Sequence, residues 1–245
     1  DILVLKNNKG TEDNRVRKLD YSIQISKLFY ERFIKNDDIT LFSPNNVPGL
    51  YEAFGMPEFD SMYLKYEKDK SIPKTTIGAQ ELFMDLLKER AETGRIYIMN
   101  LDHCNTHSSF KDKVYMSNLC QEITLPTTPI QHIDDKEGEI ALCILSAINL
   151  GLLTEIDELE ELCDLSVRSL DEIIDYQEYP VEAAKISTQA RRSLGIGYIG
   201  LAHYLAKNQV SYEHKTAAKL VDKVTEAFQF YLLKASNNLA KEKSK

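Results

Sequence analysis

The sequence predicts an α/β fold in which strands alternate with long helices and run parallel to one another. Two observations about pattern predict it: four stretches repeat apolar residues every three or four positions, and short apolar or alternating runs lie between them. The third observation is size, because 245 residues of which 43% are hydrophobic can fill a sizeable core. Since no internal repeat or low-complexity linker divides the chain, we expect residues 1–245 to form a single domain.

The helix predictions rest on apolar stripes at helical spacing. The first stripe runs from Val16 to Ile34, and the second helix ends at Gly94. The third is predicted to begin with Thr154 as its N-cap and to end before Pro180. The four predicted helices cover residues 15–35, 78–92, 154–179 and 215–241.

The strand predictions rest on short apolar or alternating runs bounded by turn-forming residues. The segment LFSPNNVPGLYEAFGMPEF, residues 41–59, contains three prolines and is predicted to be a surface loop. The predicted strands cover residues 39–43, 95–100, 139–150 and 193–200.

Composition excludes several classes of protein. The net charge is -8, and acidic and basic residues are interspersed without the basic stripe that a nucleic-acid partner requires. No run reaches the roughly 18 apolar residues that span a bilayer, and no leader pattern opens the chain, so we expect a cytoplasmic protein without a membrane partner. Four cysteines without a C-x-x-C pair are typical of free thiols in a reducing compartment. The first residue is Asp and the chain ends in KEKSK, so we expect a fragment or a split-gene product.

The segment SNLCQEITLPTTP, residues 117–129, carries the most informative chemistry. Asn118, Cys120 and Glu122 occupy positions i, i+2 and i+4, which share one face of an extended backbone at intervals of about 6.6 Å. An amide and a carboxylate flanking a thiol suit a polyhydroxylated substrate better than a metal ion, because Asn is a poor ligand. The alternative is that Cys120 is a small buried hydrophobe in a loop, with Asn118 and Glu122 solvated.

The segment SNLCQEI resembles the finger-loop motif N-x-C-x-E of ribonucleotide reductases. Further similarity to that family, closest to the class I large catalytic subunit, lies in LVLKNN, ITLFSP, VPGLY, ERAETGRIYI, DHCNTHS, GEIALCILSAINLG, DELEEL, RRSLGIG and YLLKASN, in the family's order. The resemblance implies a ten-stranded α/β barrel with the finger loop at its centre. It also implies that residues 1–245 are a partial barrel domain, incomplete at both ends.

The resemblance implies a role for four residues. Cys120 would carry a thiyl radical that abstracts the ribose 3'-hydrogen. Glu122 would act as general base on the 3'-hydroxyl, and Asn118 would orient the ribose hydroxyls, so that these three residues also bind substrate. Cys143 would be one thiol of the redox pair that reduces the substrate, although its apolar surroundings also fit a core residue.

The resemblance also implies partners. The radical would come from a metal-containing small subunit, and no cofactor or metal would bind directly to this chain. The other partners would be a ribonucleoside diphosphate, the remaining large-subunit polypeptide with its nucleotide-effector sites, thioredoxin or glutaredoxin, and further subunits of an oligomer. Because the second redox cysteine and the phosphate loop match nothing here, we expect the chain alone to be inactive. The competing hypothesis is an assembly module whose catalytic residues no longer act.

Three other patterns have ordinary structural explanations. Cys104 with His103 and His107 offers too few ligands for a structural zinc, and we expect a structural loop there, whereas Cys163 is predicted to pack in a helix. GIGYIG, residues 195–200, matches a dinucleotide fingerprint but follows a helical segment, so its glycines are predicted to allow close packing of a strand before a helix at 201–207. The carboxylates of DELEEL, residues 157–162, are predicted to form a solvated helix face.

Overall fold

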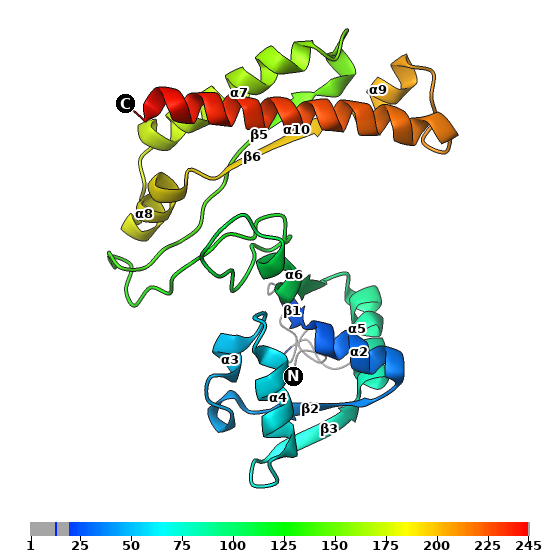
Figure 1. Ribbon diagram of the computed structural model, residues 1–245, viewed down its shortest axis with the longest axis vertical. Helices are drawn as coiled ribbons and strands as arrows, with labels where there is room; N and C mark the ends of the chain where they lie inside the picture. The colour runs from blue at the N-terminus through cyan, green and yellow to red at the C-terminus, as the bar shows by residue number, and fades with distance from the viewer. Residues whose placement is uncertain (1–12, 14–19, 245) are drawn as a thin grey trace. The chain divides into compact units, whose positions relative to one another are not determined.

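The computed structural model describes residue 13 and residues 20–244. The chain divides into two compact units, residues 1–127 and residues 128–245 (Figure 1). The fold is mixed α/β, and among the described residues the strands form three two-stranded sheets rather than a closed barrel. A single barrel domain therefore stays a prediction.

The first unit contains two strand pairs and the helices between them. In one pair, β1 (Tyr21–Ile25) lies parallel to β4 (Ile96–Asn100). In the other, β2 (Asp38–Phe42) lies antiparallel to β3 (Lys74–Gly78), so the expectation of parallel strands is wrong here. The helices are α2 (Lys27–Lys35), α3 (Leu50–Ala53), α4 (Phe59–Lys68), α5 (Ala79–Thr93) and α6 (Leu101–Thr106), with a 3-10 turn at Pro44–Asn46.

Two predictions in this unit need correction. The helix predicted at 15–35 begins only at Lys27, where Ser26 caps it through a hydrogen bond from the backbone N of Phe29, because residues 21–25 pair with β4 instead. Residues 15–19 of that prediction lie outside the described residues. The proline-containing segment 41–59 is not wholly a loop, since it contains α3 and a 3-10 turn. The helix predicted at 78–92 and the strands at 39–43 and 95–100 are confirmed within two residues.

The second unit is built on the parallel pair β5 (Ile144–Asn149) and β6 (Leu194–Ile199). Figure 1 shows the long helix α10 (Lys215–Lys243) beside α7 (Glu158–Tyr176). Both helices pack against one face of the pair, where Ile148, Ile196 and Phe228 are in a common core. The remaining elements are a 3-10 turn at Leu150–Leu152, α8 (Glu182–Arg191) and α9 (Leu201–Lys207).

The predictions for this unit are largely confirmed, with two corrections. The third helix begins at Glu158 rather than after Thr154, because the side chain of Glu158 accepts hydrogen bonds from the backbone N of Thr154 and of Glu155 and so holds the preceding turn. The strand predicted at 139–150 covers only 144–149, since Glu139 forms an isolated antiparallel bridge with Thr128.

The two faces of the β5–β6 pair differ in exposure. The face with Ile148 and Ile196 is covered by helices, whereas the opposite face leaves Leu145 61% and Ile199 55% exposed. This uncovered apolar face adjoins Cys143, which directly precedes β5. The site described below therefore includes a thiol at the edge of an open sheet face.

The core of the second unit allows a test of the fold. Leu159 on α7 has an exposed fraction of 0%, whereas Leu165 on the same helix is 52% exposed. We expect Leu159→Ala to lower the free energy of unfolding by about 2–5 kcal/mol, because it removes buried methyl groups and leaves a cavity. Leu165→Ala, the matched control, is expected to change it by about 0.5 kcal/mol or less. Urea denaturation followed by circular dichroism measures both, and equal losses would contradict the packing of α7.

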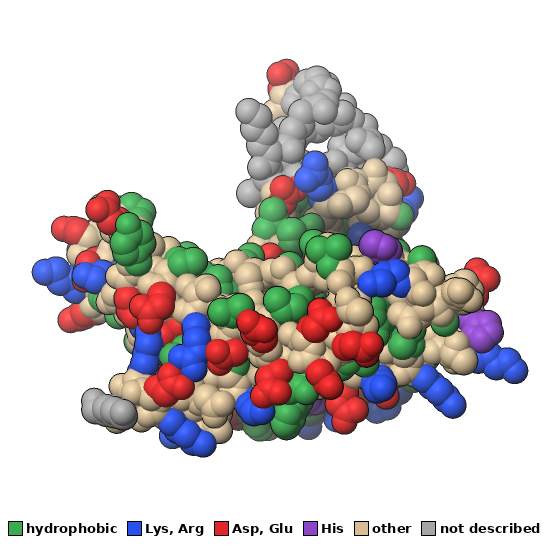
Figure 2. All heavy atoms as spheres, turned by 90° about the horizontal axis from the view of Figure 1, so that it is seen from above, with side chains coloured by type: hydrophobic (Ala, Val, Ile, Leu, Met, Phe, Trp, Pro, Cys, Tyr) green, Lys and Arg blue, Asp and Glu red, His purple; other side chains and the backbone are tan. Residues whose placement is uncertain are grey.

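Two surface properties bear on function. None of the helices described is long and apolar enough to span a membrane. On the face seen in Figure 2, Asp and Glu side chains are interspersed with Lys and Arg.

Candidate active site

The segment that carries Asn118, Cys120 and Glu122 is a closed loop. The backbone N of Asn118 donates to the carbonyl of Ile123 at 3.2 Å, and the backbone N of Gln121 donates to the carbonyl of Asn118 at 3.2 Å. The side-chain Oδ1 of Asn118 accepts from the backbone N of Ile123 at 3.0 Å. The prediction of an extended backbone is therefore wrong. A lone extended segment would leave these polar groups without partners, and the loop pairs them locally.

Gln121 carries the strain of this loop. Its φ of 68° lies in the left-handed region, which costs a residue with a side chain about 1–2 kcal/mol. Its Nε2 is buried and has no hydrogen-bond partner among the described residues. Strained backbone of this kind concentrates at functional sites, where the surrounding structure holds it in place.

The side chains of the predicted triad differ in exposure. Cys120 and Glu122 are exposed, and Asn118 is half-buried. The alternative that Cys120 is a small buried hydrophobe is therefore wrong. No hydrogen bond joins the three side chains to one another among the residues described, and Oδ1 of Asn118 is engaged within the loop. The structure thus brings the three residues into one loop without placing them on one extended face.

Tyr97 on β4 is a neighbour of Cys120 that sequence reasoning missed. Its phenol donates to Sγ of Cys120 across 4.0 Å. This hydrogen bond raises the pKa of Tyr97 above its ordinary value, because it stabilises the protonated phenol. No local pattern could have indicated the contact, since it joins a strand to a loop 23 residues later.

The chain leading to the loop is anchored by two amide side chains. Asn105 on α6 donates through Nδ2 to the carbonyl of Val114 at 3.0 Å and accepts at Oδ1 from the backbone N of Val114 at 2.9 Å. Gln24 on β1 donates to the carbonyl of Tyr115 at 2.6 Å. Asn105 belongs to DHCNTHS, which forms helix α6 and its end rather than the predicted loop. The Asn105 side chain in DHCNTHS is therefore the feature of the sequence that indicates this pair of hydrogen bonds to Val114.

Cys143 lies in the second unit. It directly precedes β5 rather than lying inside a strand, which corrects the prediction. The side chain is half-buried, and burial raises the pKa of its thiol. Cys143 is therefore largely a protonated thiol at neutral pH.

The remaining cysteines pack. Cys163 is fully buried on α7, where its Sγ lies 3.9 Å from the carbonyl of Phe228 and burial raises its pKa to about 11, so its predicted packing role is confirmed. Cys104 is half-buried against a small core that includes Val114, and burial raises its pKa. In the part of the chain that the structure describes, no cluster of three His, Cys, Asp or Glu residues is arranged to hold a metal ion.

The two other patterns behave largely as predicted. Glu158, Glu160 and Glu161 of DELEEL are exposed, which confirms the solvated face. GIGYIG forms most of β6 and leads into α9, and a side chain at Gly200 would clash with Oδ1 of Asn149. The prediction of close packing is wrong for Gly197, where an added Cβ would meet nothing within 4 Å.

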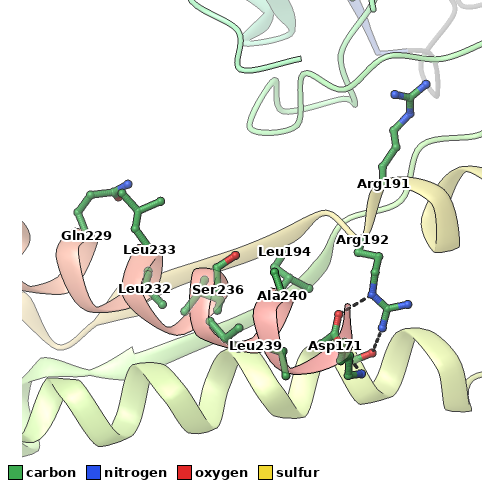
Figure 3. Close-up of a pocket in the computed structure, with 13 residues that line it drawn as sticks. Asp171, Arg191, Arg192, Leu194, Gln229, Leu232, Leu233, Ser236, Leu239 and Ala240 are labelled. Carbon is green, nitrogen blue, oxygen red and sulfur yellow. Dashed lines mark hydrogen bonds and ion pairs between the residues drawn. The ribbon is translucent and has the colours of Figure 1, made fainter. Parts of the chain in front are cut away.

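A cavity of about 530 Å³ lies between β6 and α10 (Figure 3). At one end Asp171 pairs with Arg192 at 2.5 Å, and Figure 3 shows Arg191 pointing away from this pair. Burial alone would raise the pKa of Asp171, but hydrogen bonds from Arg192 and Lys243 lower it below its ordinary value. Leu194 lines the cavity and alternates with Gly195 along β6, so the cavity lies on the face of the strand pair opposite the one that Cys143 adjoins.

The fold and the site define an α/β protein with an exposed thiol on a strained, anchored loop and a second thiol beside a parallel strand pair. The family model described as ribonucleotide reductase, barrel domain, matches residues 1–245. The chain therefore belongs to the ribonucleotide reductase family.

Curated relatives agree with this assignment. The ribonucleoside-diphosphate reductase subunit alpha of Haemophilus influenzae is 60% identical over 99% of this chain and 33% of its own length. Subunit alpha of reductase 1 from Escherichia coli K12 is 57% identical over 98% of this chain and 32% of its own length. The phage T4 subunit is 44% identical over 99% of the chain and 32% of its own length. The chain thus spans about a third of the length of the curated relatives it matches.

Proposed function

We propose that this chain supplies the radical-bearing cysteine and one reducing cysteine of the large subunit of a class I ribonucleoside-diphosphate reductase. The substrate class is ribonucleoside diphosphates, and the products are the deoxyribonucleoside diphosphates needed for DNA. The observation that carries the proposal is the exposed thiol of Cys120, flanked by Asn118 and Glu122 on a loop whose base Asn105 anchors. An exposed thiol on an anchored loop can reach a substrate while keeping a defined position.

In the proposed reaction the sulfur of Cys120, as a thiyl radical, takes the 3'-hydrogen atom of the ribose. An S–H bond forms, a C–H bond breaks, and the unpaired electron passes to the 3'-carbon. A metal-containing small subunit supplies the radical to the sulfur. The tight turn at residues 119–121 sets the position of the sulfur, because Gln121 closes it through the carbonyl of Asn118.

Glu122 takes the proton of the 3'-hydroxyl as general base. The 2'-hydroxyl then leaves as water after accepting a proton from a thiol of the redox pair, and Glu122 returns its proton to the 3'-oxygen at the end of the reaction. The carboxylate of Glu122 is exposed and two residues from the sulfur, which supports its reach to the same sugar. Asn118 orients the ribose hydroxyls through Nδ2, since its Oδ1 holds the loop closed.

Cys143 completes the reaction with a second thiol from the remaining large-subunit polypeptide. The two thiols form a disulfide and release two electrons and two protons. These reduce the 2'-carbon and balance the water that leaves. Cys120 finally returns a hydrogen atom to the 3'-carbon, and thioredoxin or glutaredoxin reduces the disulfide.

The proposed setting follows from the same assignment. The chain acts as part of a cytoplasmic oligomer with a radical-generating small subunit, and nucleotide effectors bind other regions of the large subunit. No cofactor or metal ion is assigned to this chain itself. The competing function, an assembly module, predicts that changes at residues 118, 120, 122 and 143 leave turnover intact.

Glu122→Gln in the complete reductase tests the proposal. We expect kcat to fall by about 100- to 10,000-fold, because an amide cannot take the proton of the 3'-hydroxyl. Thermal stability should not change, since the side chain is exposed. Deoxyribonucleotide formation under substrate saturation is the measurement.

Glu137→Gln is the matched control, because Glu137 is another exposed carboxylate outside regular structure. It should keep wild-type kcat. If Glu122→Gln did so as well, the general-base role would be wrong.

A further inference from the structure

Gly195 on β6 faces the side of the strand pair on which Cys143 lies. In the register of the pair, Leu145 is opposite Gly195, and Cys143 precedes Leu145 by two residues. A Cβ added to Gly195 would lie 2.8 Å from Sγ of Cys143 and 2.5 Å from Cδ2 of Leu145. Real Cβ atoms do not approach other heavy atoms this closely. The thiol of Cys143 therefore contacts the backbone at position 195, which it can do only because glycine has no side chain.

The backbone itself does not require glycine at this position. Neither Gly195 nor Gly197 has a positive φ. The described glycines that do are Gly49, Gly55, Gly94 and Gly200. Glycine inside a strand is otherwise less favourable than alanine, because glycine loses more conformational freedom on folding. A glycine in a strand that any residue could occupy indicates close approach of another group, and here that group is the sulfur.

We propose that Gly195 is a positioning residue for Cys143, whose missing side chain sets where the sulfur lies. This rests on the proposed function for its effect on turnover, because it assigns Cys143 to the redox pair. Leu145 is 61% exposed and can turn aside from an added methyl group. The side chain of Cys143 has a single rotatable bond, so its sulfur must move when a methyl group is added at position 195.

A small shift of this sulfur has a large consequence for disulfide formation. The two sulfurs of a disulfide bond at about 2.05 Å and the Cβ atoms lie about 3.5–4.5 Å apart, so the reacting thiols tolerate little displacement. An alanine Cβ at position 195 would lie 2.8 Å from Sγ of Cys143. Restoring an ordinary contact of about 3.5–4.0 Å between these two atoms displaces the sulfur by about 1 Å. A misplacement of that size can lower a rate by about 100-fold.

Gly195→Ala in the complete reductase tests the proposal, with Gly197→Ala as the matched control. Gly197 is two residues along the same strand and on the same face, and an added Cβ there meets nothing within 4 Å. We expect Gly195→Ala to lower kcat by about 10- to 100-fold with KM within about twofold of wild type. Gly197→Ala should leave both unchanged.

Two further measurements do not depend on turnover. The first is alkylation of Cys143 by iodoacetamide, followed by peptide mass spectrometry. The alkylation rate should rise several-fold in Gly195→Ala, because the displaced sulfur no longer packs against the backbone and becomes more exposed to the reagent. The second is the thermal midpoint in a cycle with Cys143→Ala: the loss caused by Gly195→Ala should largely disappear when the sulfur is absent. This cycle remains informative if the single variant unfolds, since the double variant should then regain its fold.

Equal alkylation rates in the two glycine variants, or no coupling between Gly195→Ala and Cys143→Ala, would overturn the proposal. Recovery of kcat in Gly195→Ala/Leu145→Ala would also overturn it, because the effect would then belong to Leu145. Retained turnover in Cys143→Ser would end the proposed redox role alone. It would leave the measured coupling between the two residues intact.

Discussion

Replacement of Cys120 by serine is expected to abolish ribonucleotide reduction in the complete reductase, lowering kcat by more than about 1,000-fold, which corresponds to a barrier increase above about 4 kcal/mol. An alcohol O–H bond is stronger than a thiol S–H bond, so an oxygen atom cannot hold the radical that a sulfur holds. The fold should not change, because Cys120 is exposed on a loop closed by backbone groups. Tritium taken from the 3'-carbon lies on the exposed thiol of Cys120, where it can exchange with water before a hydrogen atom is returned, so tritium release from 3'-labelled substrate reports the abstraction step.

Cys104→Ala is the control for this prediction, since Cys104 packs on α6 and takes no part in the proposed chemistry. It should retain tritium release and deoxyribonucleotide formation. The assembly hypothesis predicts the same behaviour for Cys120→Ser. Wild-type turnover in Cys120→Ser would therefore favour assembly over catalysis.

The elements that the sequence predicted well are those in which the local pattern and the packing agree. Helix α10 has its repeating apolar residues against α7, and α5 ends where Gly94 adopts a positive φ of 66°. Strand β1 was missed because YSIQI also fits a helical stripe through Ile23. What decides its conformation is pairing with β4, about 75 residues later, which no local period reveals.

The candidate site was predictable in residue type but not in geometry. The spacing of Asn118, Cys120 and Glu122 predicts an extended strand, whereas the side chain of Asn118 turns back to the backbone of Ile123 and closes a loop. Asn side chains commonly form hydrogen bonds to nearby backbone groups, so the residue type of Asn118 is compatible with a closed loop. The contact of Tyr97 with Cys120 joins a strand to a loop 23 residues later, and no local pattern predicts it. The hydrogen bonds of Asn105 to Val114 span nine residues, but they depend on how the chain turns after α6.

Cys143→Ser is expected to fail at a later step than Cys120→Ser. The 3'-hydrogen is still abstracted, so tritium release from 3'-labelled substrate should persist at a measurable rate. Reduction of the 2'-carbon should stop, because a serine and one remaining thiol cannot form a disulfide and supply two electrons. Product should fall below about one deoxyribonucleotide per large subunit, at least about a 100-fold loss over repeated turnovers, because the reducing disulfide cannot form.

The split between the two measurements distinguishes this failure from misfolding or lost substrate binding, which would stop tritium release as well. Cys143 is half-buried and burial raises its pKa, so serine at this position replaces a protonated, neutral thiol with a neutral hydroxyl and should cause little structural change. Product formation in repeated turnovers by Cys143→Ser would remove Cys143 from the redox pair. It would move the search for the reducing thiol to other cysteines of the large subunit, because Cys163 is buried and its pKa is raised to about 11.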